Sequence, residues 1–151
     1  ALGPDNSYDT KEKYLSRYPG DDYVDVLGMD NYWDLRKDAG QAGATLAHKK
    51  LKVVSDLAIE KIKVAAMTET GYEVGGTNTA VAGWFSNYLY NLLTADGLEI
   101  AFVMFWGNGG NNGNNFYVPP PSASNAQDFI DFTNKPDAVL QHQLPNLYVL
   151  P

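Results

Sequence analysis

The sequence predicts an α/β fold in which parallel strands alternate with helices. Apolar runs typical of buried strands begin near residues 24, 64 and 101, a repeat of 40 and then 37 residues, and helical patterns lie between them. Polar and aromatic residues gather just after each strand, which is where a (β/α)8 or TIM barrel carries its chemistry. Eight such units would need about 280 residues, so we expect these 151 residues to form half of such a barrel.

Four segments have the composition of strands, because they are short, apolar and ended by turn residues. The first is a truncated strand end. The last is too short and too aromatic for a helix, and we expect it to be a strand buried on both faces. In chain order the segments are residues 1–5, 23–30, 64–68 and 100–106.

Two helices have clear sequence signals. Asp9 and Glu12 have the spacing of a capping box, which predicts a short helix that ends near residue 18. Residues 45–61 predict an amphipathic helix with Lys50 and its charged neighbours largely off the apolar stripe, and the small residues at 39–43 predict a loop before it. The stripe consists of Ala47, Leu51, Val54 and Ala58. The remaining helices are expected at 79–93, 124–132 and 137–144.

The composition argues against several classes of site. There is no cysteine, and the two histidines, His48 and His142, are far apart, so we expect no disulfide, no thiol nucleophile and no bound metal. The net charge of −7 and the lack of a Lys/Arg cluster argue against a nucleic-acid partner. No apolar run approaches the roughly 20 residues of a membrane span. The Gly/Asn tract at 107–115 lacks the spacing of a phosphate-binding loop.

The strongest chemical signal is the end of the strand predicted at 64–68. The apolar run stops abruptly in Thr68-Glu69-Thr70-Gly71, which puts a carboxylate at the mouth of a buried strand, followed by a turn glycine. A barrel enzyme presents a nucleophile or a base in this way. An ordinary surface glutamate leaving a strand is the alternative. Tyr32 and Trp106 follow the two neighbouring strands, which favours the catalytic interpretation.

Five motifs occur in an order that resembles a known family. They are the segments 18–33 (YPGDDYVDVLGMDNYW), 63–73 (KVAAMTETGYE), Phe105-Trp106, 116–119 (FYVP) and Asp128-Phe129. Together they resemble the C-terminal half of glycoside hydrolase family 26, the β-mannanase family. The resemblance implies an α/β fold that forms strands five to eight of a TIM (β/α)8 barrel. Residues 1–151 would be the C-terminal part of one catalytic domain, whose N-terminal half is not in this sequence.

The resemblance also implies roles for the residues at the strand ends. Glu69, on strand seven, would be the nucleophile, and Tyr32, after strand six, would hydrogen-bond it and help to keep it ionised. Trp106, which ends strand eight, would be the aromatic floor beneath the sugar at the point of cleavage. No metal and no cofactor is implied.

Three further residues are candidates for substrate binding: Asp30, Trp33 and Asn108. Simple packing or a turn role is the alternative for Trp33 and for Asn108. Gly107 stands where many relatives carry an arginine, so the details of substrate specificity stay open.

The second carboxyl group of the reaction is expected outside this sequence. A retaining glycosidase needs two carboxyl groups about 5–5.5 Å apart, and in this family the acid/base is a glutamate in a His-Glu pair after strand four. This sequence has no His-Glu pair. Asp30 would flank Glu69 from the neighbouring strand and would not face it. An uncovered half barrel, with Met67 and Met104 lining its interior, should also pair with the missing N-terminal half.

The resemblance therefore implies an endo-acting β-1,4-mannan hydrolase (a mannan endo-1,4-β-mannosidase) that retains configuration through a glycosyl–Glu69 intermediate. Its substrate would be β-mannan or a manno-oligosaccharide, and its location secreted, cell-surface or periplasmic. A glucanase or a xylanase of the same family is the alternative among enzymes. A catalytically incomplete fragment that only binds polysaccharide is the alternative of another class.

Overall fold

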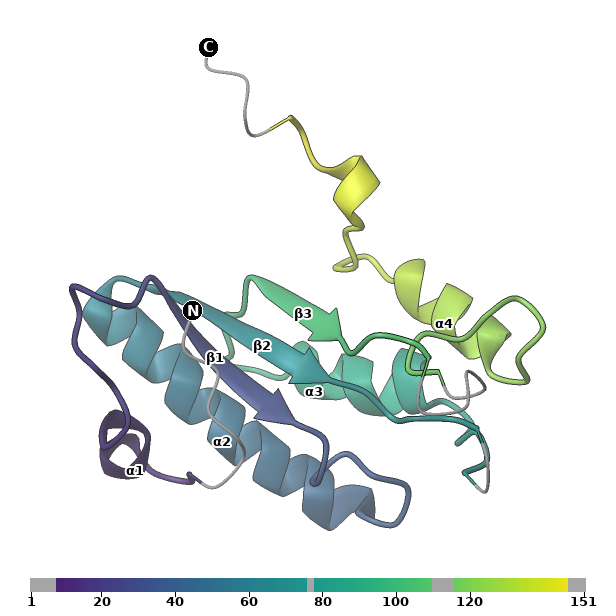
Figure 1. Ribbon diagram of the computed structural model, residues 1–151, viewed down its shortest axis with the longest axis horizontal. Helices are drawn as coiled ribbons and strands as arrows, with labels where there is room; N and C mark the ends of the chain where they lie inside the picture. The colour runs from purple at the N-terminus through teal and green to yellow at the C-terminus, as the bar shows by residue number, and fades with distance from the viewer. Residues whose placement is uncertain (1–7, 76–77, 110–115, 147–151) are drawn as a thin grey trace.

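The computed structural model describes residues 8–75, 78–109 and 116–146, which form a three-stranded parallel sheet with helices packed on one face (Figure 1). The strands are β1 (Val26–Asn31), β2 (Val64–Thr70) and β3 (Phe102–Phe105), hydrogen-bonded in that order. The predicted alternation of parallel strands with helices is confirmed. The strand end predicted at residues 1–5 lies outside the described residues.

The helix α2 (Gly40–Lys61) forms the layer behind β1 and β2 in Figure 1. Its predicted apolar stripe is buried, and in the core these side chains meet residues of the sheet such as Leu27 and Met29. Burial of this stripe stabilises the helix, because an isolated helix has little stability in water. All four members of the stripe are buried: Ala47, Leu51, Val54 and Ala58.

The loop predicted at residues 39–43 is wrong, because α2 already begins at Gly40. The small residues there serve close packing. A Cβ atom at Gly43 would lie 2.1 Å from the carbonyl oxygen of Asp34, so only glycine lets the start of the helix approach the loop after β1. The first turn of α2 is thereby fixed against that loop.

Lys50 was expected off the apolar stripe, but it is buried. It lies three residues after Ala47 and four before Val54, so helical spacing turns it toward the core. Its ammonium group pairs with the carboxylate of Asp34 at 2.6 Å, and both side chains are less than a tenth exposed. Asp34 also accepts a hydrogen bond from the Asn31 amide at 2.9 Å. This network ties the loop after β1 to α2.

The first helix, α1 (Lys11–Leu15), is shorter than predicted and has a different N-cap. Thr10, and not Asp9, is the cap, because its hydroxyl accepts a hydrogen bond from the Lys13 backbone at 3.3 Å. Asp9 instead pairs with Lys13 and with Lys49 of α2. Both residues are good N-caps, so the sequence alone does not separate adjacent candidates.

The helix predicted at 79–93 begins later, as the π-helix η1 (Trp84–Leu89), and continues as α3 (Tyr90–Leu93). Gly83, with φ of +70°, starts it. The carboxylate of Asp128 then accepts hydrogen bonds from the backbone of Phe85 at 2.9 Å and of Ser86 at 3.1 Å. A side chain distant in sequence therefore caps this helix.

The last part of the chain leads away from the sheet in Figure 1. The helix α4 (Ala126–Thr133) packs against η1 through Phe129 and Phe132. The helix predicted at 137–144 is only the short 3-10 helix η2 (Gln141–Gln143). Its apolar neighbours Leu140 and Leu144 are exposed, so they provide little packing to stabilise a longer helix.

A β-bulge interrupts the pairing of β2 with both of its neighbours. Gly28 lies opposite Ala66, but Asp30 lies opposite Glu69, so β2 contains one more residue than β1 between these pairs. The pairing with β3 shifts in the same part of β2. Bulges of this kind redirect side chains and are common next to active sites.

The bulge decides which way Glu69 points. Met67 belongs to the hydrophobic core, and Thr70 is fully buried and in register with Phe105, which packs against that core. Two residues lie between Met67 and Thr70 where strict alternation would place one. Thr68 and Glu69 therefore both fall on the opposite face of the sheet, which no described helix covers in Figure 1. We call this the open face.

The expectation that strand 100–106 is buried on both faces is wrong for the described residues. Val103 and Phe105 pack on the helix side, whereas Phe102, Met104 and Trp106 on the open face are 46%, 47% and 50% exposed. Burial of the second face would need polypeptide beyond the described residues.

The two methionines expected to line the barrel interior differ in position. Met67 is fully buried in the core on the helix side, so the prediction that it lines the barrel interior is wrong. It lies two residues after Ala65, and both side chains point to the helix side. Met104 is half-exposed on the open face, as predicted.

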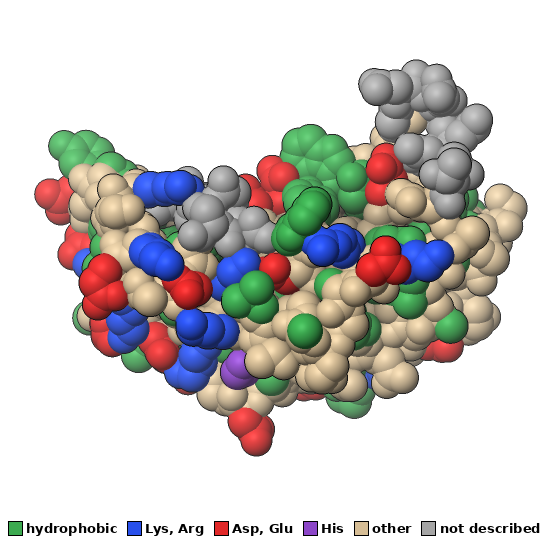
Figure 2. All heavy atoms as spheres, turned by 90° about the horizontal axis from the view of Figure 1, so that it is seen from below, with side chains coloured by type: hydrophobic (Ala, Val, Ile, Leu, Met, Phe, Trp, Pro, Cys, Tyr) green, Lys and Arg blue, Asp and Glu red, His purple; other side chains and the backbone are tan. Residues whose placement is uncertain are grey.

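The surface seen from below carries Lys and Arg side chains lying among Asp and Glu side chains (Figure 2). Lys61 pairs with Asp21 at 3.0 Å and Lys11 with Glu60, which links α1 and the segment after it to α2. Exposed pairs of this kind contribute little to stability. Within the described ranges, no helix is long and apolar enough to cross a membrane.

We predict that Lys50→Ala lowers the free energy of unfolding by about 3–5 kcal/mol, because Asp34 then stays buried without its counter-charge. Lys49→Ala is the matched control: it removes the neighbouring, exposed ammonium group and should leave that free energy nearly unchanged. Urea unfolding of the full-length protein, followed by tryptophan fluorescence, measures both. Equal, small losses in the two variants would show that the buried pair does not stabilise the fold.

Candidate active site

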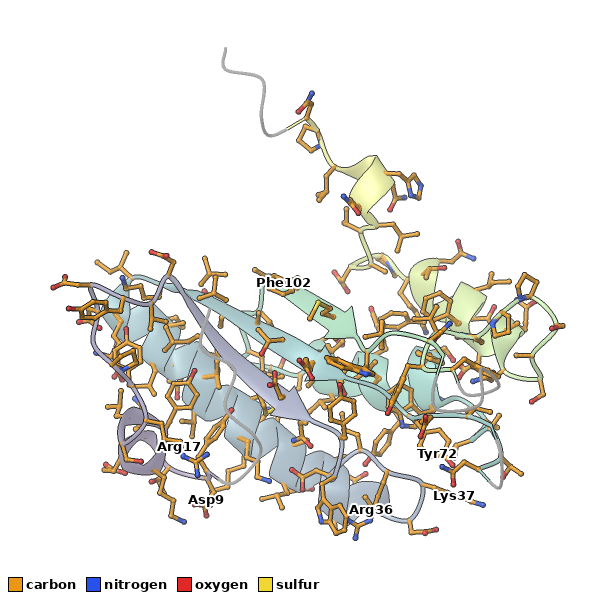
Figure 3. All side chains as sticks on the ribbon, in the orientation of Figure 1. Asp9, Arg17, Arg36, Lys37, Tyr72 and Phe102 are labelled. Carbon is orange, nitrogen blue, oxygen red and sulfur yellow. The ribbon has the colours of Figure 1, made fainter. Side chains whose placement is uncertain are left out.

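The candidate site lies where the three parallel strands end. Tyr72 and Phe102 mark opposite ends of the sheet in Figure 3, and the site is at the Tyr72 end. At this end the Tyr32 hydroxyl donates a hydrogen bond to Oε2 of Glu69 at 3.1 Å. The bond joins the loop after β1 to the bulge of β2. The structure thus brings together the two residues for which the sequence predicts catalytic roles.

The environment of Tyr32 keeps it a hydrogen-bond donor. Burial and then the hydrogen bond to the Glu69 carboxylate raise the pKa of Tyr32 well above the ordinary value for a tyrosine. Its hydroxyl therefore stays protonated at neutral pH and points its hydrogen at Glu69. Because Oε2 accepts this bond, the other carboxylate oxygen is left for a reacting group.

Asp30 lies beside Glu69 in the same register of the sheet. Its Oδ1 accepts a hydrogen bond from the Thr68 hydroxyl at 2.7 Å, so the bulge orients both carboxylates. Adjacent strands are about 4.8 Å apart, which makes Asp30 a flank of Glu69 and not the opposite wall of a cleft. This is the place beside Glu69 that the sequence predicts for Asp30.

Trp106 continues the ladder one residue past β3. Its backbone N–H donates to the carbonyl oxygen of Thr70 at 3.1 Å, and it alternates with Phe105, so its ring belongs to the open face. The ring is 50% exposed. A half-exposed aromatic plane beside a carboxylate is suited to stacking against the apolar face of a sugar.

Trp33 and Asn108 have contacts of their own. Trp33 is 66% exposed, and the Arg36 guanidinium lies 3.9 Å from its ring centre, near the start of α2 (Figure 3). Asn108 uses its side chain to hold backbone: Oδ1 accepts from the N–H groups of Tyr117 and Val118, and Nδ2 donates to the Val118 carbonyl. The predicted binding of substrate by these two residues stays a prediction.

The described residues bring together no group of three or more His, Asp or Glu side chains that could hold a metal ion.

Comparison with known proteins decides the family. The family model of Glycosyl hydrolase family 26 matches residues 1–89, more than half of the chain. The chain belongs to this family. The resemblance seen in the sequence is thus confirmed. The matched residues end before β3, so this match does not include Trp106 or Asn108.

Relatives of this family 26 chain include a mannan endo-1,4-beta-mannosidase of Bifidobacterium adolescentis, which is 32% identical over 154 residues, 85% of this chain and 15% of that protein. The solved structure of GH26C from Muricauda sp. MAR_2010_75 is 46% identical, with a TM-score of 0.90 over 99% of this chain and 39% of its own. An endo-beta-1,4-mannanase from Cellulomonas fimi is 30% identical, with a TM-score of 0.80 over 95% of this chain and 32% of its own.

The family 26 chain thus spans less than half the length of these relatives. Its sheet of parallel strands with helices between them corresponds to part of their TIM (β/α)8 barrel. The predicted fold class, a partial barrel, is therefore confirmed.

Sequence reasoning assigns no role to Tyr117, whose ring is 5.8 Å from that of Tyr32, centre to centre, and inclined to it by 65°. Tyr117 also lies against Gly71. The residue is separated from Tyr32 by most of the chain, and only the register of the strands brings the two loops together. The sequence signal that could have suggested it is the aromatic pair Phe116-Tyr117 directly after the Gly/Asn tract.

The raised pKa of Tyr32 leads to a prediction for alkaline pH. A tyrosine whose pKa is higher in the folded protein contributes stability below about pH 10, the ordinary tyrosine value, and this contribution is lost as the pH rises toward the folded value. We expect tyrosinate absorbance of the parent minus that of Tyr32→Phe to show one group that ionises above the ordinary value. An ionisation step at or below that value would contradict the buried, hydrogen-bonded state of Tyr32.

Proposed function

We propose that this chain forms part of the catalytic barrel of an endo-acting β-1,4-mannan hydrolase, a mannan endo-1,4-β-mannosidase. Membership of family 26 and the mannanases among its relatives support the proposal. The observation that carries it is the hydrogen bond from Tyr32 to Glu69 at the carboxyl end of the sheet. In a TIM barrel this end holds the catalytic residues.

In this proposal Glu69 is the nucleophile of a two-step, retaining reaction. Its free carboxylate oxygen attacks the anomeric carbon, the glycosidic bond breaks, and the leaving oxygen takes a proton from a general acid. The product of this step is a glycosyl ester on Glu69. In the second step the same acid/base group removes a proton from water, and the water oxygen displaces Glu69 and restores the original configuration.

The neighbouring residues have supporting roles. Tyr32 holds Oε2 and so orients the carboxylate for attack. Trp106 stacks beneath the sugar at the cleavage point, and Asp30 accepts a hydrogen bond from a sugar hydroxyl beside it. Trp33, at the outer rim, provides a plane for a more distant sugar. Asn108 shapes the cleft by fixing the backbone at 117–118.

We also propose that the N-terminal half of the same barrel covers the open face and supplies the general acid/base. The half-exposed Phe102 and Met104 support this, because apolar side chains side by side on a sheet face usually meet other protein. The acid/base would stand about 5–5.5 Å from Glu69, across the cleft. Asp30 is on the adjacent strand and holds the Thr68 hydroxyl, so it is poorly placed for that task.

A second candidate function is binding of polysaccharide without cleavage. The placement of Asp30 beside Glu69, and not opposite it, favours this function for the chain on its own. A polymeric substrate cannot cross a membrane intact, so under either function we place the protein outside the cell, at the cell surface or in the periplasm.

We predict that Glu69→Gln in the full-length protein lowers kcat/KM on β-mannan by at least about a thousandfold, because an amide cannot form the glycosyl ester. Glu99→Gln is the matched control. Glu99 is exposed, precedes β3 and lies at the other end of the sheet, so this variant should keep parental activity. Release of reducing sugar from β-mannan, with mixed-linkage glucan and xylan as comparison substrates, measures the effect.

Each outcome distinguishes the alternatives. Glu69→Ala supplied with azide should form a glycosyl azide of inverted configuration, which identifies the position as the nucleophile. Faster hydrolysis of glucan or xylan than of mannan would favour another polysaccharide as substrate. Binding of mannan without turnover by the parent would favour the binding function, and a Glu69→Gln variant as fast as the parent would contradict the nucleophile assignment.

A further inference from the structure

The loops that follow β1, β2 and β3 meet at Tyr117. Its ring packs edge-on against Tyr32, in the first of these loops, with 5.8 Å between ring centres. The same ring lies on Gly71, directly after β2. Tyr117 itself belongs to the segment after β3. One side chain thus contacts Tyr32 itself and the backbone two residues after Glu69.

The backbone on each side of Tyr117 is fixed by hydrogen bonds. The Asn108 side chain accepts from the N–H groups of Tyr117 at 2.8 Å and Val118 at 3.0 Å, and donates to the Val118 carbonyl at 2.7 Å. On the other side, Phe116 and Val74 exchange two backbone hydrogen bonds, both of 2.9 Å. The Tyr117 ring is therefore attached to a backbone segment whose position is fixed by these hydrogen bonds.

Only glycine at position 71 leaves room for the Tyr117 ring. A Cβ atom there would lie 2.4 Å from Cδ1 of Tyr117, which is closer than atoms can approach. The φ of Gly71 is +150°, a conformation that side chains other than glycine rarely adopt. The missing side chain lets the Tyr117 ring rest on the backbone two residues after Glu69.

We propose that Tyr117 is a positioning residue, whose ring holds that of Tyr32 in the orientation in which its hydroxyl reaches Glu69. This inference rests on the proposed function of Glu69. Tyr32 is only partly buried and follows its strand, so rotation about its side-chain bonds would break the hydrogen bond. An edge-to-face ring contact opposes that rotation by a factor of about two to ten.

The hydroxyl of Tyr117 is not needed for this role. Burial, and then the charge of the Glu73 carboxylate, raise the pKa of Tyr117, so its hydroxyl stays neutral at neutral pH. The contact that matters is between rings. Phenylalanine at this position should therefore replace tyrosine, whereas an aliphatic side chain should not.

The test compares five variants of the full-length protein on a manno-oligosaccharide substrate. Tyr117→Leu should lower kcat about five- to tenfold and leave KM within about twofold, because orientation of the nucleophile is lost and sugar binding is not. Tyr117→Phe should stay within about twofold of the parent. Gly71→Ala should resemble Tyr117→Leu, because the added methyl group displaces the ring. The double variant Tyr32→Phe/Tyr117→Leu should have a kcat within about twofold of that of Tyr32→Phe alone.

Active molecules are counted by trapping the glycosyl–enzyme with a 2-fluoro glycoside, so that kcat refers to folded protein. If Tyr117→Leu does not fold, the pair Tyr117→Phe and Gly71→Ala decides. Losses that multiply in the double variant, or that fall on KM, would overturn the inference, because Tyr117 would then act independently of Tyr32. Loss of activity in Tyr117→Phe would also overturn it. Failure of the proposed function would appear differently, as parental activity in Glu69→Gln.

Discussion

The alternation of side chains along β2 is the constraint on which the candidate site depends. If alternation continued unbroken from the buried Met67, Glu69 would point into the helix-side core, where an uncompensated carboxylate costs on the order of several kcal/mol. The bulge adds one residue and turns Thr68 and Glu69 together onto the open face. Thr70 then enters the core, where its hydroxyl donates to the carbonyl oxygen of Asn31 at 2.8 Å.

The position of Tyr32 depends on a second, polar constraint. The loop that carries it is held by the buried Asp34–Lys50 pair, by the Asn31 amide and by the close approach of Gly43. Trp84 adds a hydrogen bond from its indole N–H to the carbonyl oxygen of Leu35 at 2.9 Å. A buried ion pair is a poor source of stability by comparison with apolar packing. Here it fixes a geometry, because it joins α2 to the loop that reaches Glu69.

Much of the fold and of the site follows from local sequence patterns. The strands, the buried stripe of α2 and the gathering of Tyr32, Glu69 and Trp106 at one end of the sheet all depend on periodicity and on the rule that parallel strands end together. The polar and aromatic residues at the strand ends alone indicate where the candidate site lies.

The remaining features depend on pairings between distant residues. The burial of Lys50 requires Asp34, which lies in a different element, and the start of η1 requires Asp128. The bulge in β2 appears only when its pairing with both neighbours is known. Tyr117 is 46 residues from Gly71 and further from Tyr32, so nothing in its own surroundings in the sequence indicates its contact with them.

The open face changes character along the strands. Near the strand starts, Gly28, Ala66 and Phe102 form one row, in which two small residues stand in register with a large aromatic one. Near the strand ends, the side chains are Asp30, Thr68, Glu69 and Trp106. An apolar interior at one end and polar groups at the other is the division expected inside a TIM barrel, where the lower layers form a core and the upper end carries chemistry.

This change along the open face gives the exposed side chains of β3, and Trp106 after it, two different roles. Phe102 and Met104 need covering protein to be stable on that face, whereas Trp106 needs an opening into which a sugar can enter. Along one face, β3 therefore supplies apolar side chains for a core, and the residue directly after it supplies a ring for a cleft. The transition between them occurs level with the bulge of β2, which places the carboxylate of Glu69 at the boundary between core and cleft.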